Sequence, residues 1–293
     1  MVEKTKVLIT GSRGMLGSKL VDALSSGYEI KGIDIRDCDI TNRQEIIKII
    51  NDYNPDIIIH TAAYTDVDGS ELNRQRAFAV NAQGTENVAE AAKVIGAILF
   101  FISTDYVFDG KKDKPYAEQD RPHPVNIYGE SKLEGEKIIQ ALLRKYFILR
   151  TSWLFGPGGK NFVTTILEMA REKKALRVVK DQLGSPTYTL DLAGAIKSLL
   201  DNCCWQEADN FGIYHITNSE SCSWYEFAKK IILLKQLKTE ILPISSSESK
   251  CPAVRPKMSI LDNSKFITTF KLNLRPWPEA VRHFLLNDEE NKP

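Results

Sequence analysis

Short apolar runs alternate with helix-period segments through the first half of the chain. The apolar runs predict strands at Lys6–Thr10, Tyr28–Asp34, Asp56–His60, Ile98–Ser103 and Tyr146–Arg150. Several of them, such as Asp-Ile-Ile-Ile-His, have no polar alternation, which is typical of parallel strands covered on both faces. Apolar residues recur at helical spacing between them, which predicts helices over Met15–Ser25, Asn42–Asn51, Glu71–Ile95 and Tyr128–Leu143. This alternation predicts an α/β fold with a doubly wound parallel sheet.

The pattern loosens after Arg150. Glycine and proline interrupt it at residues 156–159, at Ser185-Pro186 and at Leu242-Pro243. Helical periodicity continues in four segments, Asn161–Lys173, Leu190–Asp201, Trp224–Gln236 and Pro278–Asn287. We predict a Rossmann-type dinucleotide-binding domain over residues 1–151 and a smaller, mostly helical substrate-binding lobe over residues 152–293. Because open α/β sheets bind ligands outside the carboxyl ends of their strands, the lobe is expected to close over that edge, with the chain crossing back between the two parts.

Composition narrows the class of protein. The 293 residues are 43% hydrophobic and 26% charged, and the formal net charge of +1 gives no reason to expect nucleic acid or a membrane surface as a partner. No apolar run approaches the ~20 residues of a membrane span, and the first residues form no signal-peptide pattern. The five cysteines include the adjacent Cys203-Cys204 and no CxxC spacing, which favours reduced thiols. We expect a soluble cytoplasmic protein.

A glycine-rich turn follows the first predicted strand. Gly11, Gly14 and Gly17 stand in the spacing GxxGxxG between that strand and the next helix. The first glycine permits the tight bend, the second lets backbone amides approach a pyrophosphate, and the third lets the helix pack on the sheet. The turn therefore predicts a dinucleotide site, against the alternative of a glycine turn without a ligand. Cofactor contacts are expected along the whole turn, at Gly11, Arg13, Gly14, Met15, Leu16 and Gly17.

Two opposing signals at the end of the second strand bear on the choice of dinucleotide. Asp34 is placed to bind ribose hydroxyls, which favours NADH, whereas Arg36 is placed to meet a 2′-phosphate, which favours NADPH. We predict NADPH or NADH, with NADPH slightly favoured. Asp39 and Ile40 are expected near the adenine edge, although Asp39 is equally explained as a turn carboxylate.

A tyrosine and a lysine four residues apart open the last predicted helix of the first half. Residues at this spacing share a helix face, so the Lys132 ammonium is expected beside the Tyr128 phenol. A neighbouring positive charge stabilises phenolate and would lower the Tyr128 pKa toward working pH, as suits a general acid for carbonyl reduction. The fourth strand ends in Ser103 and Thr104, and the Thr104 hydroxyl can hold the same carbonyl. Each residue alone also has an ordinary explanation, as a turn cap, an amphipathic ring or a solvated charge.

These motifs together resemble the extended short-chain dehydrogenase/reductases, and among them the dTDP-4-dehydrorhamnose reductase family. The resemblance runs from residue 7 to about residue 262. It is carried by the segments 39–41 (DIT), 60–68 (HTAAYTDVD), 103–110 (STDYVFDG), 128–136 (YGESKLEGE), 149–156 (LRTSWLFG), 161–163 (NFV), 181–188 (DQLGSPTY) and 255–256 (RP). It implies reduction of the 4-keto group of dTDP-4-dehydro-L-rhamnose to dTDP-L-rhamnose, with Tyr128 as the proton donor and Lys132 holding the nicotinamide ribose.

The resemblance also implies contacts for individual residues. Cofactor contacts are implied for Ala62, Ala63, Tyr64, Ser103, Tyr128 and Lys132. Substrate contacts are implied for Val67, Thr104, Asp105, Tyr106, Trp153, Gln182, Gly184 and Arg255. Within the second set, Trp153 would line the sugar pocket, and the last three would lie near the nucleotide diphosphate, where a guanidinium suits paired phosphate oxygens. Asn81 matches an asparagine that shapes the active-site helix, with a capping or kink role equally open.

Three other functions stay open at this stage. A dehydratase or epimerase could use the same scaffold, but a dehydratase needs a carboxylate base after Thr104-Asp105, where this chain has Tyr106. A non-catalytic regulatory protein is the second, because the β-subunit of methionine adenosyltransferase resembles the same branch. The third is a 4-ketoreductase for another nucleotide sugar. Mg²⁺ is conceivable at the acidic residues 288–290, but we predict no metal site, and a homodimer is left open.

Overall fold

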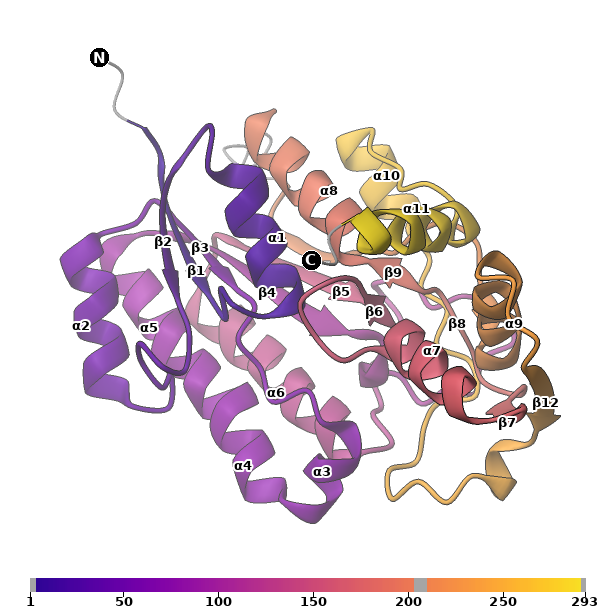
Figure 1. The fold of residues 1–293 in the computed structure, drawn as a ribbon. Helices are drawn as coiled ribbons and strands as arrows, with labels where there is room; N and C mark the ends of the chain where they lie inside the picture. The colour runs from indigo at the N-terminus through magenta and orange to yellow at the C-terminus, as the bar shows by residue number, and fades with distance from the viewer. Residues whose placement is uncertain (1–3, 203–209, 291–293) are drawn as a thin grey trace.

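A six-stranded sheet forms the centre of the molecule (Figure 1). The structure, a computed structural model, describes residues 4–202 and 210–290. The strands of the sheet are β1 (Lys6–Thr10), β2 (Glu29–Ile33), β3 (Ile57–His60), β4 (Ile98–Thr104), β5 (Tyr146–Thr151) and β10 (Gly212–His215). They lie in the order β10-β5-β4-β3-β1-β2, and every neighbouring pair is parallel. The carboxyl ends of the strands therefore meet at one edge, and the connections reverse direction between β1 and β3.

Helices cover both faces of this sheet. One face is packed by α1 (Met15–Leu24), α8 (Thr189–Asp201) and α10 (Ser264–Phe270). The other face is packed by α2 (Arg43–Tyr53), α5 (Thr85–Ile95) and α6 (Ile127–Leu142). Successive strand residues alternate between the two cores, with Val7 and Ile9 in the first and Leu8 in the second. The predicted α/β fold with a doubly wound parallel sheet is confirmed.

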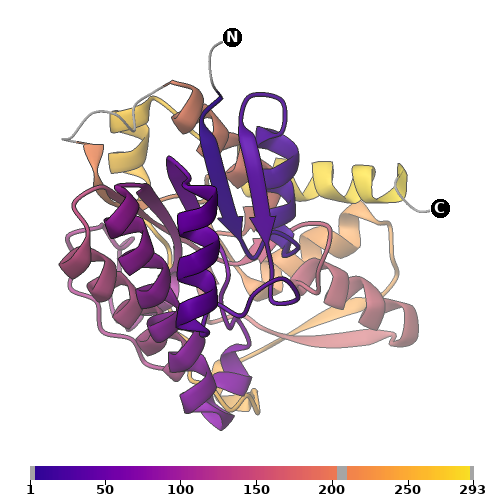
Figure 2. The ribbon, with the colours of Figure 1, turned by 90° about the vertical axis from the view of Figure 1, so that its left-hand side faces the viewer.

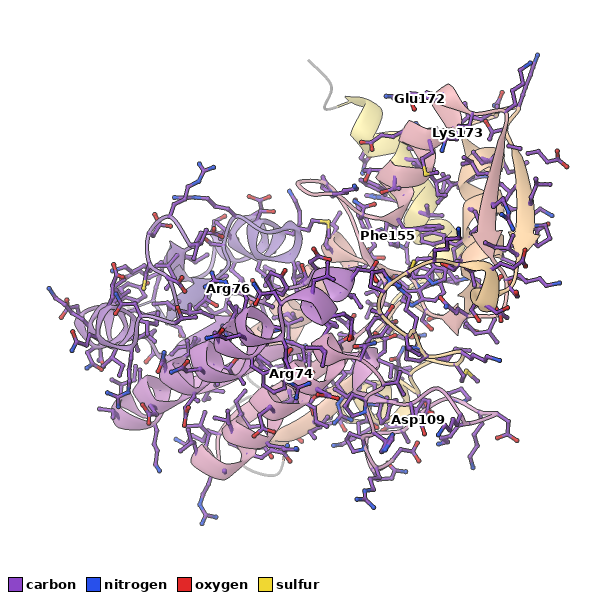
Figure 3. All side chains as sticks on the ribbon, turned by 90° about the horizontal axis from the view of Figure 1, so that it is seen from below. Arg74, Arg76, Asp109, Phe155, Glu172 and Lys173 are labelled. Carbon is purple, nitrogen blue, oxygen red and sulfur yellow. The ribbon has the colours of Figure 1, made fainter. Side chains whose placement is uncertain are left out.

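A smaller lobe lies beside the carboxyl edge of the sheet and has its own core. Its helices are α7 (Phe162–Glu172), α9 (Trp224–Leu234) and α11 (Trp277–Glu290), and its strands pair as β6 (Leu154–Phe155) with β9 (Thr187–Tyr188), β7 (Ala175–Val179) with β12 (Glu240–Ile244), and β8 (Leu183–Gly184) with β11 (Cys222–Ser223). Figure 2 shows α11, in yellow, extending away from the sheet. In Figure 3, Glu172 and Lys173 lie in this lobe, well separated from Arg74 and Arg76.

The helix predicted over Glu71–Ile95 is wrong as a single element. The chain instead forms α3 (Val67–Leu72), α4 (Arg74–Phe78), a π-helical segment (Ala79–Gly84) and then α5. The Asn73 side chain accepts a hydrogen bond from the Arg76 amide (3.0 Å), which caps α4 and interrupts the helix. Within the π-helical segment, the Asn81 side chain bonds both the N–H (2.8 Å) and the C=O (3.0 Å) of Tyr64. Asn81 thus anchors the loop after β3 to the helical layer.

The second half of the chain returns to the central sheet. β10 pairs with β5, and α8 packs on α1, although both elements follow residue 152. None of β7, β10, β12 and α10 is predicted from the sequence, because each is short and has little regular alternation. The division of the chain at residue 151 stays a prediction, and the structure adds that elements on both sides of it build the same sheet layer.

Candidate active site

Most of the predicted site residues line one cavity of about 730 Å³, which we term the main cavity. The predicted residues on its wall are Gly11, Gly14, Met15, Leu16, Gly17, Asp34, Asp39, Ile40, Ala62, Ala63, Tyr64, Val67, Ser103, Thr104, Asp105, Tyr106, Tyr128, Lys132 and Trp153. They come from the carboxyl ends of the five strands β1 to β5 and from the starts of α1, α3 and α6, around the point where the sheet connections reverse. Open α/β sheets bind their ligands at this place.

The glycine turn has the shape that a bound pyrophosphate requires. Gly11 has φ +68°, and a Cβ there would stand 2.8 Å from the Ala62 amide nitrogen. A Cβ at Gly17 would stand 2.0 Å from the Gly11 carbonyl oxygen, so α1 packs directly on the turn. The Gly14 N–H donates to that same carbonyl (3.0 Å), and α1 begins at the next residue. Backbone amides at a helix N-terminus hold phosphate oxygens, so the turn fits the diphosphate of a dinucleotide.

A second loop, absent from the sequence prediction, closes over this turn. Residues 158–160 (Gly-Gly-Lys) line the main cavity, and a Cβ at Gly159 would stand 2.6 Å from Met15 Cγ. The Asn161 side chain holds the loop by donating to the carbonyls of Gly156 (2.8 Å) and Gly159 (3.1 Å). The loop therefore brings a lysine to the wall that the glycine turn forms.

The charged residues predicted to bind the ribose of the cofactor do not all line the main cavity. Asp34 lines the main cavity, and its carboxylate accepts hydrogen bonds from the amides of Arg13 (3.2 Å) and Ile35 (2.9 Å). The Arg13 guanidinium lies outside the main cavity in an exposed ion pair with Asp37 (3.0 Å). Arg36 is exposed and does not line the cavity. Exposed ion pairs stabilise little, so Arg13 can exchange its partner for a phosphate at the rim.

Asp39 is a turn carboxylate that also lines the main cavity, and its place near the adenine stays a prediction. Its Oδ1 accepts hydrogen bonds from the N–H (2.9 Å) and the hydroxyl (2.8 Å) of Thr41, as a turn carboxylate does. It also lines the main cavity beside Ile40 and pairs with Arg76 (3.5 Å), a wall residue that the sequence did not suggest. Burial acts to raise the pKa of Asp39, but the Thr41 bonds and the Arg76 charge hold it below its ordinary value.

Tyr128 stands in the first turn of α6, whose position is fixed by two contacts. The Asn126 side chain accepts a hydrogen bond from the Gly129 N–H (2.8 Å) and caps the helix. A Cβ at Gly129 would stand 2.1 Å from the Tyr106 carbonyl oxygen, so only glycine lets α6 approach this closely. The approach brings the Tyr128 and Tyr106 rings edge to face, with centroids 5.9 Å apart. Tyr128 and Lys132 share the helix face that lines the main cavity.

The expectation that Lys132 lowers the Tyr128 pKa is wrong. Burial raises the pKa of Tyr128 to about 12, although the neighbouring Thr104 hydroxyl acts in the opposite direction. The Lys132 ammonium lies over the Phe101 ring, 3.9 Å from its centroid. Burial lowers the pKa of Lys132 to about 7, although Glu136 acts to raise it. Tyr128 therefore keeps its proton throughout neutral pH, which is the state that a proton donor needs.

Thr104 and Asp105 form a buried polar pair at the end of β4. Thr104 Oγ1 donates to Asp105 Oδ1 (3.1 Å) and accepts from the Tyr106 amide (3.2 Å). Asp105 is 2% exposed, and within the described residues its Oδ2 has no hydrogen-bond partner. Burial raises the pKa of Asp105 to about 7, against hydrogen bonds that act to lower it. Asp105 lines the main cavity, but this oxygen is itself buried, and the nearby Ser259 hydroxyl is among the groups that act on the carboxyl.

Replacing Asp105 by asparagine should change how stability depends on pH. The folded state raises the Asp105 pKa, so the protonated carboxyl stabilises the fold at low pH, and this contribution is lost as pH rises from 3.8 toward about 7. Relative to the wild type, the free energy of unfolding of Asp105→Asn should increase by ~2 kcal/mol between about pH 5 and about pH 8. Urea unfolding at both pH values measures this difference. A difference that does not depend on pH would contradict the raised pKa.

A buried ion pair lies next to Ser103, near the carboxyl end of β4. Arg150, which is 1% exposed, donates to Glu136 through Nε (2.9 Å) and Nη2 (2.6 Å). The Ser103 hydroxyl donates to the same carboxylate (2.5 Å), so this predicted cofactor contact has its side chain bonded within the protein. Because Glu136 follows Lys132 by one turn of α6, the ion pair also fixes the helix that carries Lys132.

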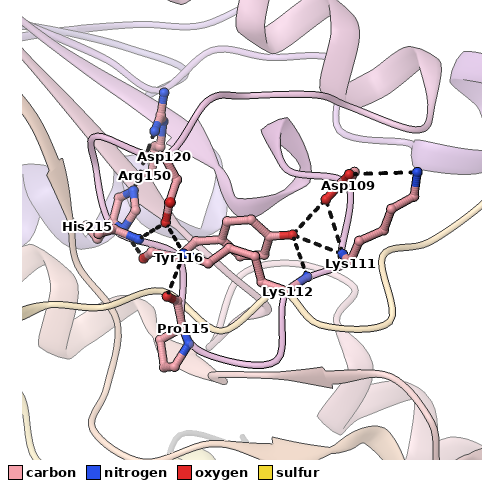
Figure 4. Close-up of polar contacts among 9 residues, drawn as sticks. Asp109, Lys111, Lys112, Pro115, Tyr116, Asp120, Arg150 and His215 are labelled. Carbon is pink, nitrogen blue, oxygen red and sulfur yellow. Dashed lines mark hydrogen bonds and ion pairs between the residues drawn. The ribbon is translucent and has the colours of Figure 1, made fainter.

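The buried network continues from Arg150 to a surface loop (Figure 4). Arg150 Nη1 lies 3.5 Å from His215 Nε2, and His215 Nδ1 lies 2.9 Å from the Tyr116 carbonyl oxygen. Since a carbonyl oxygen only accepts, Nδ1 has the proton and Nε2 accepts from Arg150. The Tyr116 hydroxyl in turn donates to Asp109 Oδ1 (2.8 Å) and accepts from the Lys111 amide (3.0 Å). The network ties the loop over residues 109–116 to the end of β5.

Trp153 is held rigidly on the wall of the main cavity. Its backbone has φ +48°, and its indole stacks on Trp224 with centroids 3.4 Å apart and planes 9° apart. A Cβ at Gly184 would stand 2.4 Å from the Trp153 ring, so Gly184, which lines neither large cavity, lies against this indole. Trp224 is on the walls of both cavities, and no sequence signal suggested it. It starts α9 after the capping residue Ser223.

A second cavity of about 1080 Å³ adjoins the first. Gln182 and Arg255, both predicted substrate contacts, line this second cavity and not the main one. Trp224 belongs to both walls, so the cavities are neighbours. Basic side chains and apolar side chains line the second cavity together, among them Lys111, Phe162, Leu176, Arg177 and Lys257. This combination suits an aromatic base with a phosphate chain.

The described residues contain neither a cluster of metal ligands nor a membrane-spanning helix. Over residues 4–202 and 210–290 there is no group of three or more His, Cys, Asp or Glu side chains that could hold a metal ion. The side chains of Asp288, Glu289 and Glu290, where Mg²⁺ was considered, lie outside the described ones. No helix in the same part of the chain is long and apolar enough to cross a membrane.

The fold and the main cavity together define an NAD(P)-dependent oxidoreductase of the short-chain dehydrogenase/reductase class. The chain belongs to the family described as the RmlD substrate binding domain, which matches residues 5–289. It is 41% identical over 282 residues to the spore coat polysaccharide biosynthesis protein SpsK of Bacillus subtilis, covering 96% of this chain and 97% of that protein. It is 39% identical over 286 residues to the dTDP-4-dehydrorhamnose reductase of Aggregatibacter actinomycetemcomitans, covering 95% and 97%.

A solved structure shows the same likeness. The crystal structure of dTDP-4-dehydrorhamnose reductase from Bacillus anthracis in complex with NADP matches this fold with a TM-score of 0.91 at 42% identity. The match covers 97% of this chain and 99% of that chain. The resemblance inferred from the motifs is therefore confirmed at the level of the family.

Proposed function

We propose that this protein reduces the 4-keto group of dTDP-4-dehydro-L-rhamnose to give dTDP-L-rhamnose, with NADPH or NADH as the reductant. The observation that supports this most is that Tyr128, whose raised pKa keeps it protonated at neutral pH, lies beside Thr104 in the cavity that the glycine turn lines. The names of the relatives support the substrate, and the NADP complex of the Bacillus anthracis enzyme supports the cofactor.

Each of the catalytic side chains in the main cavity has its own role in the reaction. A dinucleotide with its diphosphate at the glycine turn would supply, from its nicotinamide, the hydride that reduces the carbonyl carbon. Tyr128 donates its phenolic proton to the carbonyl oxygen as negative charge develops there. Thr104 Oγ1 lies beside the phenol and can hold that oxygen once its single proton turns from Asp105 Oδ1 to the carbonyl. Lys132 lines the same wall as Tyr128, where the resemblance implies that it holds the nicotinamide ribose.

The two cavities suggest how the substrate lies. The sugar would occupy the main cavity, beside the Trp153 indole and the polar end of β4 at Thr104 and Asp105. The diphosphate would pass Arg255, and the nucleoside would enter the second cavity beside Gln182 and Phe162. Small-molecule binding sites are usually lined by apolar and aromatic side chains together with a few polar groups.

The other functions considered from the sequence are less well supported. Burial raises the pKa of Tyr106 above its ordinary value, so this residue cannot replace the carboxylate base of a dehydratase at neutral pH. A purely regulatory protein would have no use for Tyr128 and Thr104 side by side in the main cavity. In addition, relatives at 33–39% identity are named as reductases. The third alternative, a 4-ketoreductase for another nucleotide sugar, is tested by the assay below.

Two further parts of the proposal concern the protein in the cell. We place it in the cytoplasm, because a nicotinamide cofactor and a nucleotide sugar are the small molecules that its cavities suit. A homodimer stays a prediction from the resemblance alone.

A cofactor-oxidation assay tests the function. With dTDP-4-dehydro-L-rhamnose, the protein should oxidise NADPH and NADH at measurable rates, NADPH the faster. Omission of the sugar nucleotide should stop the reaction. Conversion of dTDP-glucose to its 4-keto-6-deoxy product without added cofactor would instead identify a dehydratase.

A further inference from the structure

The Asp68–Arg255 ion pair lies at the passage between the two cavities, and its Asp68 member has no role in the steps above. Asp68 belongs to α3 and follows Val67, a wall residue of the main cavity, whereas Arg255 lines the second cavity. Arg255 Nη1 and Nη2 donate to the two Asp68 carboxylate oxygens at 3.2 Å and 2.9 Å. The guanidinium also lies beside the Tyr106 hydroxyl, on the side of the main cavity.

Asp68 uses only one edge of the guanidinium. It binds the end that Nη1 and Nη2 form, and Nη1 also donates to the Ala253 carbonyl (3.3 Å). Across the described residues, Arg255 Nε donates no hydrogen bond. A guanidinium can bind a second anion bidentately through its Nε–Nη2 edge. A phosphate can therefore bind Arg255 while Asp68 stays in place.

The same carboxylate fixes the backbone that carries Arg255. Asp68 Oδ1 accepts from the Ala253 amide (3.1 Å), and Asn126, the cap of α6, donates to the Val254 carbonyl (2.8 Å). The segment is thus held by α3 and by the start of the helix that carries the proton donor. Burial acts to raise the pKa of Asp68, but bonds from Arg255 and the Ala253 amide hold it below its ordinary value.

We propose that Asp68 is a positioning residue for substrate binding, which holds the Arg255 guanidinium at the passage with its Nε–Nη2 edge turned to the diphosphate. The inference rests on the proposed function and deepens it. Without the carboxylate, the long arginine side chain samples other rotamers, and the cost of ordering it falls on binding. The loss should appear in KM and not in kcat, because Asp68 does not touch the reacting carbonyl.

The test compares binding of dTDP with binding of thymidine, which lacks the phosphates, by calorimetry. Asp68→Asn should weaken dTDP binding about tenfold, the size expected for hydrogen bonds to a charged group, and leave thymidine binding unchanged. KM for the sugar nucleotide should rise by the same factor at constant kcat. In the Arg255→Ala background, Asp68→Asn should have no further effect on dTDP. Asp68→Glu, which keeps the charge, should recover part of the loss.

A matched control removes the same charge from the same helix. Asp66 caps α3 by accepting from the Gly69 amide (2.8 Å) and does not contact Arg255. Asp66→Asn keeps a good cap and should leave dTDP binding unchanged. Equal dTDP affinity in Asp68→Asn and wild type, or equal losses for dTDP and thymidine, would overturn the positioning role and leave the proposed function intact. A wild-type protein that binds dTDP no better than thymidine would overturn both.

Discussion

Tyr128→Phe should lower kcat for carbonyl reduction by ~10²–10⁴, the range for a positioned general acid. Tyr128 is half-buried, its pKa is raised to about 12, and it lies beside the Thr104 hydroxyl in the main cavity. Phenylalanine keeps the ring in place and removes only the hydroxyl group with its proton. Steady-state kinetics with NADPH would measure the loss, and quenching of protein fluorescence should show that the variant still binds the cofactor.

Tyr53→Phe is the matched control for this variant. Burial also raises the pKa of Tyr53 to about 12, but its hydroxyl donates to the Glu29 carbonyl (2.8 Å) and it does not line the main cavity. It should keep wild-type turnover. If Tyr128→Phe retained full activity, the proton would have to come from another group and the mechanism would be wrong.

Gly17→Ala should lower the free energy of unfolding by more than ~3 kcal/mol and abolish cofactor binding. The added Cβ would stand 2.0 Å from the Gly11 carbonyl oxygen and 2.8 Å from the Gly11 carbonyl carbon. Both are backbone atoms of the turn, so relief requires the turn itself to move. Urea unfolding and NADPH titration would measure the two effects.

Gly194→Ala is the corresponding control. Gly194 lies in α8, and a Cβ there would meet nothing within 4 Å. Alanine in a helix interior is favoured over glycine by ~0.5–1 kcal/mol, so this variant should be slightly more stable than the wild type. Equal effects of the two substitutions would contradict the close packing of α1 on the glycine turn.

The residues of the main cavity could be predicted because their signals are local. The glycine spacing, the Tyr128–Lys132 spacing and the polar end of β4 each arise within a few residues of chain, and parallel strands bring such ends to one edge. The apolar runs predicted the first five strands of the sheet for the same reason. Local pattern was therefore enough for five of the six strands and for the ligand edge of the sheet, but it missed β10.

The electrostatics of the site could not be predicted in this way. The spacing of Tyr128 and Lys132 predicted a lowered Tyr128 pKa, but burial dominates and raises it. Burial also lowers the pKa of Lys132, whose ammonium lies over Phe101. Burial depends on which elements cover a side chain, and neighbours far apart in sequence decide that.

Contacts between distant segments were likewise missed. Trp224 meets Trp153, and Asp68 meets Arg255, only after the second half of the chain has folded against the first. The π-helical segment that carries Asn81 depends on hydrogen bonds to the loop after β3. The helical spacing of apolar residues does not reveal these hydrogen-bond partners. Glu71–Ile95 was therefore predicted as a single helix.

Transfer of label from the cofactor to the sugar tests the central claim most directly. NADPH that has deuterium at the transferred position of its nicotinamide would be incubated with dTDP-4-dehydro-L-rhamnose and the protein, and the product examined by NMR and mass spectrometry. We predict dTDP-L-rhamnose with deuterium at C4 of the sugar and a proton on its new hydroxyl. A product without deuterium at C4, or oxidation of NADPH that does not require the sugar nucleotide, would contradict the account.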